Sequence, residues 1–162
     1  MKIRLTPELS YIIGLWVHCR TEKGIGVRGD GETVSNFAKS CLDLGVAVPG
    51  KILYGESKIF FYNSAIRKFF DKIYGERTAR FKYGNEYSEA YLAGLFDSGG
   101  SVEKGRVCMK GLDIFDKNLL DNLRMFPKDA GRFTIIGKDK AFLKFISPYV
   151  KRNKAILESA KI

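Results

Sequence analysis

The amino-acid sequence predicts an α+β fold made of two similar halves, each with the order helix, strand or hairpin, helix, hairpin, helix. Two observations predict it. A degenerate internal repeat runs through the chain, and helical and strand-like patterns follow in the same order in both halves. The chain has 162 residues, 45% of them apolar, which is enough for two small halves that share one core.

The repeat is clearest in two apolar segments that we expect to be helices. Leu9–Trp16 and Glu89–Phe96 share a Tyr, an aliphatic residue, Gly, Leu and an aromatic residue in register. Helix starts are expected at Thr6-Pro7 and at Ser88-Glu89, where a hydroxyl can cap the first turn. Small residues let two helices approach closely. We therefore expect these helices to pack together, with the contact at Ile13, Gly14, Ala93 and Gly94.

The rest of the first half follows from its periodicity. A strand is expected at Ile25–Arg28 and a helix at Thr33–Leu44, where apolar residues recur at helical spacing. Lys51–Tyr54 and Lys58–Tyr62 flank a Gly-containing turn and predict a hairpin. A helix is expected at Ala65–Tyr74, which closes a first half that spans residues 1–76.

The second half repeats this order. We expect a strand at Arg106–Lys110, a helix at Lys117–Phe126, a strand at Arg132–Ile136 and a helix at Lys140–Tyr149. The basic, Gly-containing segment 77–86 is interpreted as a linker, residues 87–150 as the second half, and 151–162 as a polar helical tail.

The segment Leu92–Ser101 resembles the LAGLIDADG motif of homing endonucleases. Identical positions in the second half are Leu92, Ala93, Gly94, Leu95, Asp97 and Gly100. The first copy, Ile12–Arg20, keeps the Gly-Leu pair and the apolar face. The resemblance implies that the two halves are LAGLIDADG-like repeats in a pseudo-twofold arrangement, with the strands of both forming a β saddle along DNA.

In that family, each motif helix ends in an acid, and the two acids hold divalent metal ions, usually Mg²⁺, at the scissile phosphates. Carried over by position, the acid falls on Cys19 in the first half and on Gly99 in the second. Neither side chain is a good ligand for a hard cation. The resemblance therefore implies no catalytic residue, no metal and no cofactor at these positions.

Displaced acids are an alternative source of a Mg²⁺ site. Asp97 stands two positions before Gly99, and Glu22 and Glu103 recur in both halves beside a Lys-Gly pair. We expect Asp97 to support the helix end, and both glutamates to lie in solvent-facing turns. If the chain does cleave DNA, these three carboxylates are the candidates.

The charge of the chain favours a polyanionic partner. Lys and Arg total 28 against 18 Asp and Glu, which gives a formal net charge of +10 at pH 7. Phosphate contacts by such residues release condensed counterions. If the partner is nucleic acid, most of the basic residues on strands, turns and the linker should share one face: Arg28, Lys51, Lys58, Arg80, Lys82, Lys104, Arg106, Lys110, Arg132 and Lys138.

The sequence therefore favours a nucleic-acid-binding protein without cleavage activity, with a regulatory or maturase-like role on duplex DNA or on RNA. The alternatives are an active Mg²⁺-dependent endonuclease and a structural or protein-interaction domain. Two repeats in one chain predict a pseudo-dimeric monomer. The chain shows no signal peptide or membrane-spanning run, so we expect an intracellular, cytoplasmic protein without a membrane partner.

Overall fold

The computed structural model describes residues 3–152, 154 and 157. The first half contains three α-helices, three strands and a 3-10 turn. In chain order these are α1 (Pro7–Trp16), β1 (Ile25–Arg28), α2 (Gly31–Asp43), η1 (Pro49–Lys51), β2 (Leu53–Gly55), β3 (Lys58–Phe61) and α3 (Ser64–Arg80).

The second half has the same order, with one strand more. It consists of α4 (Glu86–Gly99), β4 (Gly100–Glu103), β5 (Arg106–Lys110), α5 (Ile114–Asn122), β6 (Pro127–Ala130), β7 (Phe133–Ile136) and α6 (Asp139–Ile146). In the first half, an isolated bridge between Arg20 and Val27 stands in the place of the β4–β5 hairpin. The predicted α+β class is confirmed, and the strands form two antiparallel sheets.

Several expected boundaries differ from the structure. Helix α3 continues to Arg80, so the connection between the halves is 81–85 and not 77–86. Helix α4 begins at Glu86, before the expected Ser88, because Asn85 and Ser88 form a capping box at its N-terminus. Most of the expected helical tail at 151–162 lies outside the described residues.

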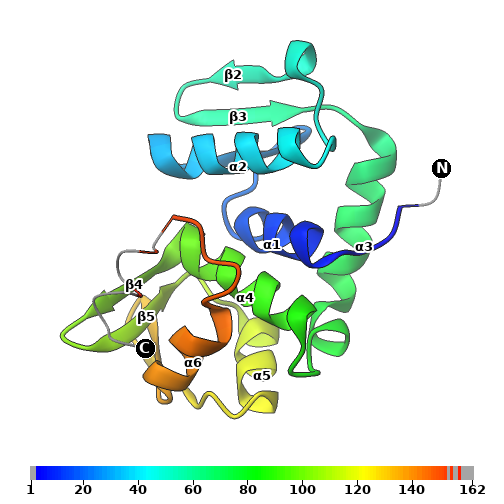
Figure 1. Ribbon diagram of the computed structural model, residues 1–162. Helices are drawn as coiled ribbons and strands as arrows, with labels where there is room; N and C mark the ends of the chain where they lie inside the picture. Colours follow the sequence, from blue (N-terminus) through cyan, green and yellow to red (C-terminus); the bar gives the residue numbers. More distant parts are fainter. Residues whose placement is uncertain (1–2, 153, 155–156, 158–162) are drawn as a thin grey trace.

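Each half has one sheet, and the two sheets lie on either side of a central helix pair. The strand order is β1-β3-β2 in the first sheet and β4-β5-β7-β6 in the second, and all neighbours are antiparallel. Helix α2 covers the first sheet, and α1 and α4 meet at the centre of the molecule (Figure 1). No helix in the described part of the chain is long and apolar enough to cross a membrane.

The contact between α1 and α4 depends on two glycines. A Cβ added to Gly14 would lie 2.2 Å from the carbonyl oxygen of Tyr91, and one added to Gly94 would lie 2.2 Å from that of Tyr11. Any side chain at either position would collide with the opposite backbone. The expected helix contact at these two glycines is therefore present, and it is reciprocal between the halves.

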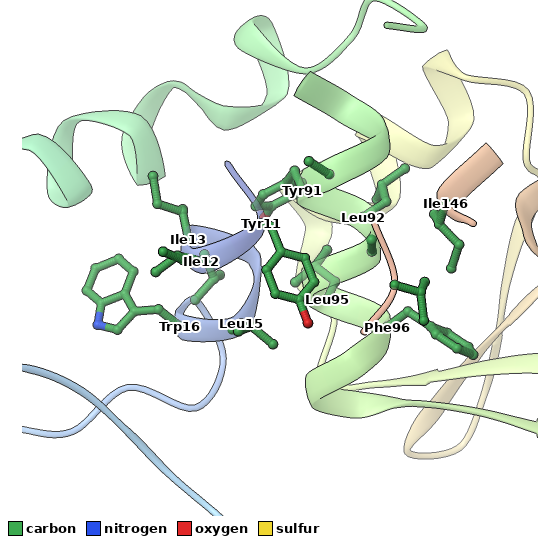
Figure 2. Close-up of a cluster of buried hydrophobic side chains, with 14 of the residues drawn as sticks. Tyr11, Ile12, Ile13, Leu15, Trp16, Tyr91, Leu92, Leu95, Phe96 and Ile146 are labelled. Carbon is green, nitrogen blue, oxygen red and sulfur yellow. The ribbon is translucent and has the colours of Figure 1, made fainter. Parts of the chain in front are cut away.

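The other two residues expected at this contact face elsewhere. Ile13 and Ala93 each precede a contact glycine by one residue, which turns them by about 100° around the helix axis. Figure 2 shows Ile13 directed away from α4, whereas Tyr11 and Leu15 lie between the two helices. Both Ile13 and Ala93 are buried.

Aromatic contacts attach the remaining helices to this pair. Trp16 of α1 meets Phe70 of α3 edge to face, with ring centroids 5.3 Å apart. Phe81 stacks on Tyr91 at 4.4 Å, which fixes the connection between the halves against α4. These contacts attach α3 to α1, and the connection between the halves to α4.

Candidate nucleic-acid interface

A cavity of about 500 Å³ lies where α1 and α4 end. Cys19 and Gly99, the two positions at which the LAGLIDADG resemblance places the metal-binding acids, both line it. Arg28 and Lys110, from the ends of β1 and β5, line it as well. The fold therefore brings the two positions together, as the resemblance implies, but it surrounds them with cations.

Asp97 lines the same cavity and has a structural role. Its Oδ2 accepts a hydrogen bond from the Tyr11 hydroxyl at 2.5 Å, and from the backbone N–H groups of Lys151 and Arg152 at 2.8 and 3.2 Å. Burial, followed by the charge of Asp97, raises the pKa of Tyr11 well above its usual range. Asp97 thus joins α4, α1 and the segment that follows α6, as expected for a carboxylate that supports the helix end.

The second carboxylate of the cavity is Asp30, which caps α2. Its Oδ1 accepts from the backbone N–H of Thr33 at 2.8 Å, and its Oδ2 accepts from Arg152 at 2.7 Å. The Thr33 hydrogen bonds and the Arg152 guanidinium hold the pKa of Asp30 below its usual value. This carboxylate is charged, but a guanidinium already balances it.

The residues present do not fit a Mg²⁺ ion between two acids. Mg²⁺ takes oxygen ligands, whereas Cys19 offers a thiol whose pKa is raised by burial, and Gly99 offers no side chain. Glu22 and Glu103 are exposed and do not line the cavity, and Glu103 pairs in register with Arg106 at the outer end of the β4–β5 hairpin. The displaced acids considered from the sequence are thus not brought together with Asp97.

Gly99 also leaves little room for an acid. A Cβ added there would lie 3.0 Å from the carbonyl oxygen of Lys110, the residue beside it across the hairpin. Such a contact is tighter than almost all real Cβ contacts, and the atom it meets is backbone. An aspartate at this position would require the start of β4 to move away from the end of β5.

The outer face of the first sheet, away from α2, carries basic and apolar side chains. Arg28 and Lys58 are direct partners across β1 and β3, so they point to the same side. Their face is opposite to that of the buried Val27 and Ile59. The Lys58 ammonium lies 5.6 Å from the ring centroid of Phe60, two residues along the same face.

The second sheet has a similar outer face. Arg106 and Lys110 alternate with the buried Val107 and Met109 of β5, so they point away from the core. Lys110 is the direct partner of Phe133, which is 39% exposed and also lines the cavity. Both sheets therefore present cations with an aromatic ring beside them, and the cavity lies between them.

The other basic residues predicted for the interface divide into two groups. Lys51, Lys104, Arg132 and Lys138 lie in turns next to strands. Arg80 and Lys82 do not belong to the strand surface. They precede the N-terminus of α4, whose 14 residues place about 20 Å between its two ends. Arg80 is ion-paired with Glu76, and Lys82 lies over the Tyr83 ring.

Three residues near the interface were missed by sequence reasoning. Phe133 and Arg152 line the cavity, and Lys128 is exposed on β6. β6 has the sequence Pro-Lys-Asp-Ala, which has no β-branched or aromatic residue to indicate a strand. Arg152 belongs to the segment interpreted as a tail. For Phe133, the sequence predicted a place in a strand but gave no indication of a role in binding.

A separate buried ionic network joins the halves behind the cavity. Asp116 accepts hydrogen bonds from Arg77 at 3.1 Å and from Tyr91 at 2.7 Å, and its Oδ2 lies 2.5 Å from His18 Nε2. Arg77 also bonds to Asp113. Burial works to raise the pKa of Asp116, but His18, Tyr91 and Arg77 together lower it.

This network contains a group of potential metal ligands. Ligand atoms of His18, Asp113 and Asp116 lie within 4.8 Å of one another. The guanidinium of Arg77 already bonds to both aspartates and supplies the positive charge that a metal ion would bring. We therefore interpret the group as a salt-bridge network that holds the halves together.

The architecture, with two sheets beside a glycine-packed helix pair, is the LAGLIDADG homing endonuclease fold. Solved structures of the homing endonuclease I-DmoI are similar to the chain. A structure of its mesophilic variants matches with a TM-score of 0.64 at 15% sequence identity. The structure of I-DmoI in complex with DNA and Ca matches with a TM-score of 0.61 at 16% sequence identity. Both matches cover 94% of this chain and 97% of the other chain.

A third solved structure is a point variant of I-DmoI in complex with its target DNA in the presence of 2 mM Mg. It has a TM-score of 0.59 at 13% identity, with 85% of this chain and 93% of the other covered. No protein-family model matches the chain, and no curated protein matches it in sequence. At 13–16% sequence identity, the similarity to these structures establishes the fold of the chain and nothing further.

Proposed function

We propose that this protein binds duplex DNA along the outer faces of its two sheets and does not cleave it. The observation that carries the proposal is the composition of the cavity between the sheets. Cys19 and Gly99 occupy the positions of the metal-binding acids, and Arg28 and Lys110 stand beside them. I-DmoI, which has the same fold, has been solved with DNA and a divalent cation.

Binding and cleavage separate on physical grounds. Loss of a metal-binding acid removes the stabilisation of the transition state but leaves phosphate contacts intact. A phosphodiester that approaches Arg28 and Lys110 meets positive side chains directly and needs no bridging cation. We therefore expect DNA affinity to be independent of Mg²⁺ and to fall steeply as salt increases.

The single chain supplies both halves of the interface, and we propose that it acts as a pseudo-dimeric monomer inside the cell. Its role would be regulatory or maturase-like, with RNA as the alternative nucleic acid. No described arrangement favours a displaced-acid nuclease, because Glu22 and Glu103 do not line the cavity that contains Asp97.

A gel titration of the full chain against a mixed pool of duplex DNA, with Mg²⁺ or with EDTA and at two salt concentrations, tests the proposal. We expect equal retardation with Mg²⁺ and EDTA, weaker retardation at high salt, and intact DNA throughout. Cleavage confined to the Mg²⁺ lanes would contradict the proposal, and so would the absence of any retardation at low salt.

The face used is tested by charge reversal. The double variant Lys58→Glu with Arg106→Glu reverses the charge of one outer-face cation in each half. The slope of log K against log salt concentration should then become shallower, by the equivalent of about two phosphate contacts. Lys82→Glu with Lys140→Glu is the matched control, since both lysines are exposed and lie outside the strands, before α4 and in α6. Equal losses in the two double variants would show that binding does not use the strands.

A further inference from the structure

A second cavity, of about 1110 Å³, lies along α3. No residue on the outer faces of the two sheets lines it. One wall is a stripe of α3 that runs from Ala65 to Arg80, and the other walls come from Ile3–Leu5 and from Tyr83 and Tyr87. In Figure 1, α3 runs along the opposite edge of the molecule from the β4–β5 hairpin. We call this cavity the α3 groove.

The floor of the α3 groove is apolar. Ile3, Leu5, Phe69 and Tyr87 are half-buried and pack against the core, and Ile73 is buried. Ala65 and Ala79 lie exposed at either end of the α3 stripe.

The rim of the α3 groove is basic. Of the charged residues described along its walls, Arg4, Lys68, Lys72 and Arg80 are cations, and Glu76 is the single carboxylate. Glu76 already accepts a hydrogen bond from Arg80 at 2.7 Å. Arg4, Lys68 and Lys72 have no ion-pair partner among the described residues. The rim thus offers positive charge on both sides of an apolar floor.

We infer that the α3 groove is a docking site for an acidic amphipathic helix of a partner protein. A helix-in-groove contact places apolar residues, spaced at i, i+3, i+4 and i+7, on the floor, and its flanks meet the rim. Acidic flanks complement Arg4, Lys68 and Lys72. The α3 stripe of 16 residues, about 24 Å long, accommodates a partner helix of roughly four turns.

The aliphatic part of the floor favours a helix over single-stranded nucleic acid as the occupant. Bases stack on exposed aromatic faces, whereas the floor here includes the aliphatic side chains of Ile3, Leu5 and Ile73. Docking of a helix on the α3 groove would also leave the outer faces of both sheets accessible. The inference goes beyond DNA binding and does not require it.

The test uses the full chain and a fluorescent helical peptide of about 18 residues, with leucines at i, i+3, i+4 and i+7 and glutamates on the flanks. Fluorescence anisotropy should show micromolar binding that weakens with salt. Lys68→Glu with Lys72→Glu should weaken binding about tenfold and gain affinity for the same peptide with lysines in place of glutamates.

The matched control is Lys140→Glu with Lys144→Glu, the same charge change on the exposed side of α6, which should leave peptide binding unchanged. Circular dichroism would verify that both double variants are folded. The inference is overturned if the wild-type chain does not bind the peptide at low salt, if both double variants bind it equally, or if single-stranded RNA of similar length displaces it. DNA retardation of the same preparations reports on the proposed function separately.

Discussion

Asp97 shows how a carboxylate that lines the cavity at the ends of α1 and α4 can serve the fold. It accepts one hydroxyl and two backbone hydrogen bonds on a single oxygen, and these bonds join three separate segments of the chain. Such a carboxylate fixes the ends of α1 and α4 relative to the segment that follows α6. Asp97 therefore contributes to the stability of the fold, and the sequence alone already favoured this structural role.

Replacement of Asp97 by Ala is expected to lower the free energy of unfolding by about 3 kcal/mol, because it leaves buried donors without their charged acceptor. Urea denaturation at neutral pH measures this. Asp71→Ala removes a carboxylate from an exposed i,i+4 pair with Arg67, and should cost less than about 0.5 kcal/mol. Equal effects of the two substitutions would contradict the structural role of Asp97.

The raised pKa of Tyr11 predicts a loss of stability in alkali. Below about pH 10 the phenol is neutral in both states, and above it the unfolded state ionises while the folded state retains the proton. The free energy of unfolding should therefore decrease as the pH rises above about 10. Tyr11→Phe should show a shallower decrease across about pH 9 to 11, although it is less stable at neutral pH. An unchanged slope would count against the burial of this phenol.

At the scale of the elements, the contact between α1 and α4 leaves no room for a side chain at its two glycines. Gly14→Ala places a methyl group against the Tyr91 carbonyl, and should destabilise the protein by about 3 kcal/mol or prevent folding. Gly75→Ala, in α3 with open space around it, should stabilise by about 0.5–1 kcal/mol. Thermal denaturation of both variants measures this difference in stability. Similar melting temperatures for the two variants would be incompatible with the close approach of α1 and α4 at Gly14.

The elements that the sequence predicted well are those with strong periodicity. Ile25–Arg28 and Arg106–Lys110 were expected with the bounds that the structure has, because each is a short apolar run that ends at a basic residue. β4 has no strand-like pattern of its own, since its Gly-Ser start carries little strand propensity. The end of α3 was placed too early, because its last turns are polar and Gly75 interrupts them.

The candidate site was predictable in its positions but not in its surroundings. Alignment of the two repeats with the LAGLIDADG motif identified Cys19 and Gly99. Such an alignment identifies equivalent positions without knowledge of the fold. The contribution of Arg152 could not be foreseen, because it depends on where the chain passes after α6. Arg80 and Lys82 were assigned to the interface from charge alone, and charge does not say which end of α4 a residue occupies.

At the scale of the whole molecule, each half neutralises aspartates of the other. Arg77 of α3 bonds to the N-cap residue Asp113 of α5, and Arg152, after α6, bonds to the N-cap residue Asp30 of α2. These two crossed pairs, together with the α1–α4 contact, make the halves dependent on one another.

We therefore expect one cooperative unfolding transition, although the chain consists of two similar halves. Circular dichroism and Trp16 fluorescence, which report on the whole chain and on the first half respectively, should give coincident urea curves. Arg77→Met, which leaves Asp113 and Asp116 without their buried cation, should shift both curves together to lower urea. Separation of the two curves in the wild-type chain would mean that the halves fold independently.

The crowding at Gly99 has a consequence for the history of the protein. One nucleotide change turns any glycine codon into a codon for aspartate or glutamate, so an acid at this position is genetically close. The Lys110 carbonyl 3.0 Å from the new Cβ would oppose that change, and Lys110 and Arg28 would balance the new charge without a metal ion. A second acid would still be needed at Cys19. A metal site made of two acids at Cys19 and Gly99 would thus require several changes, and the first of them, at Gly99, would meet a crowded backbone without completing the site.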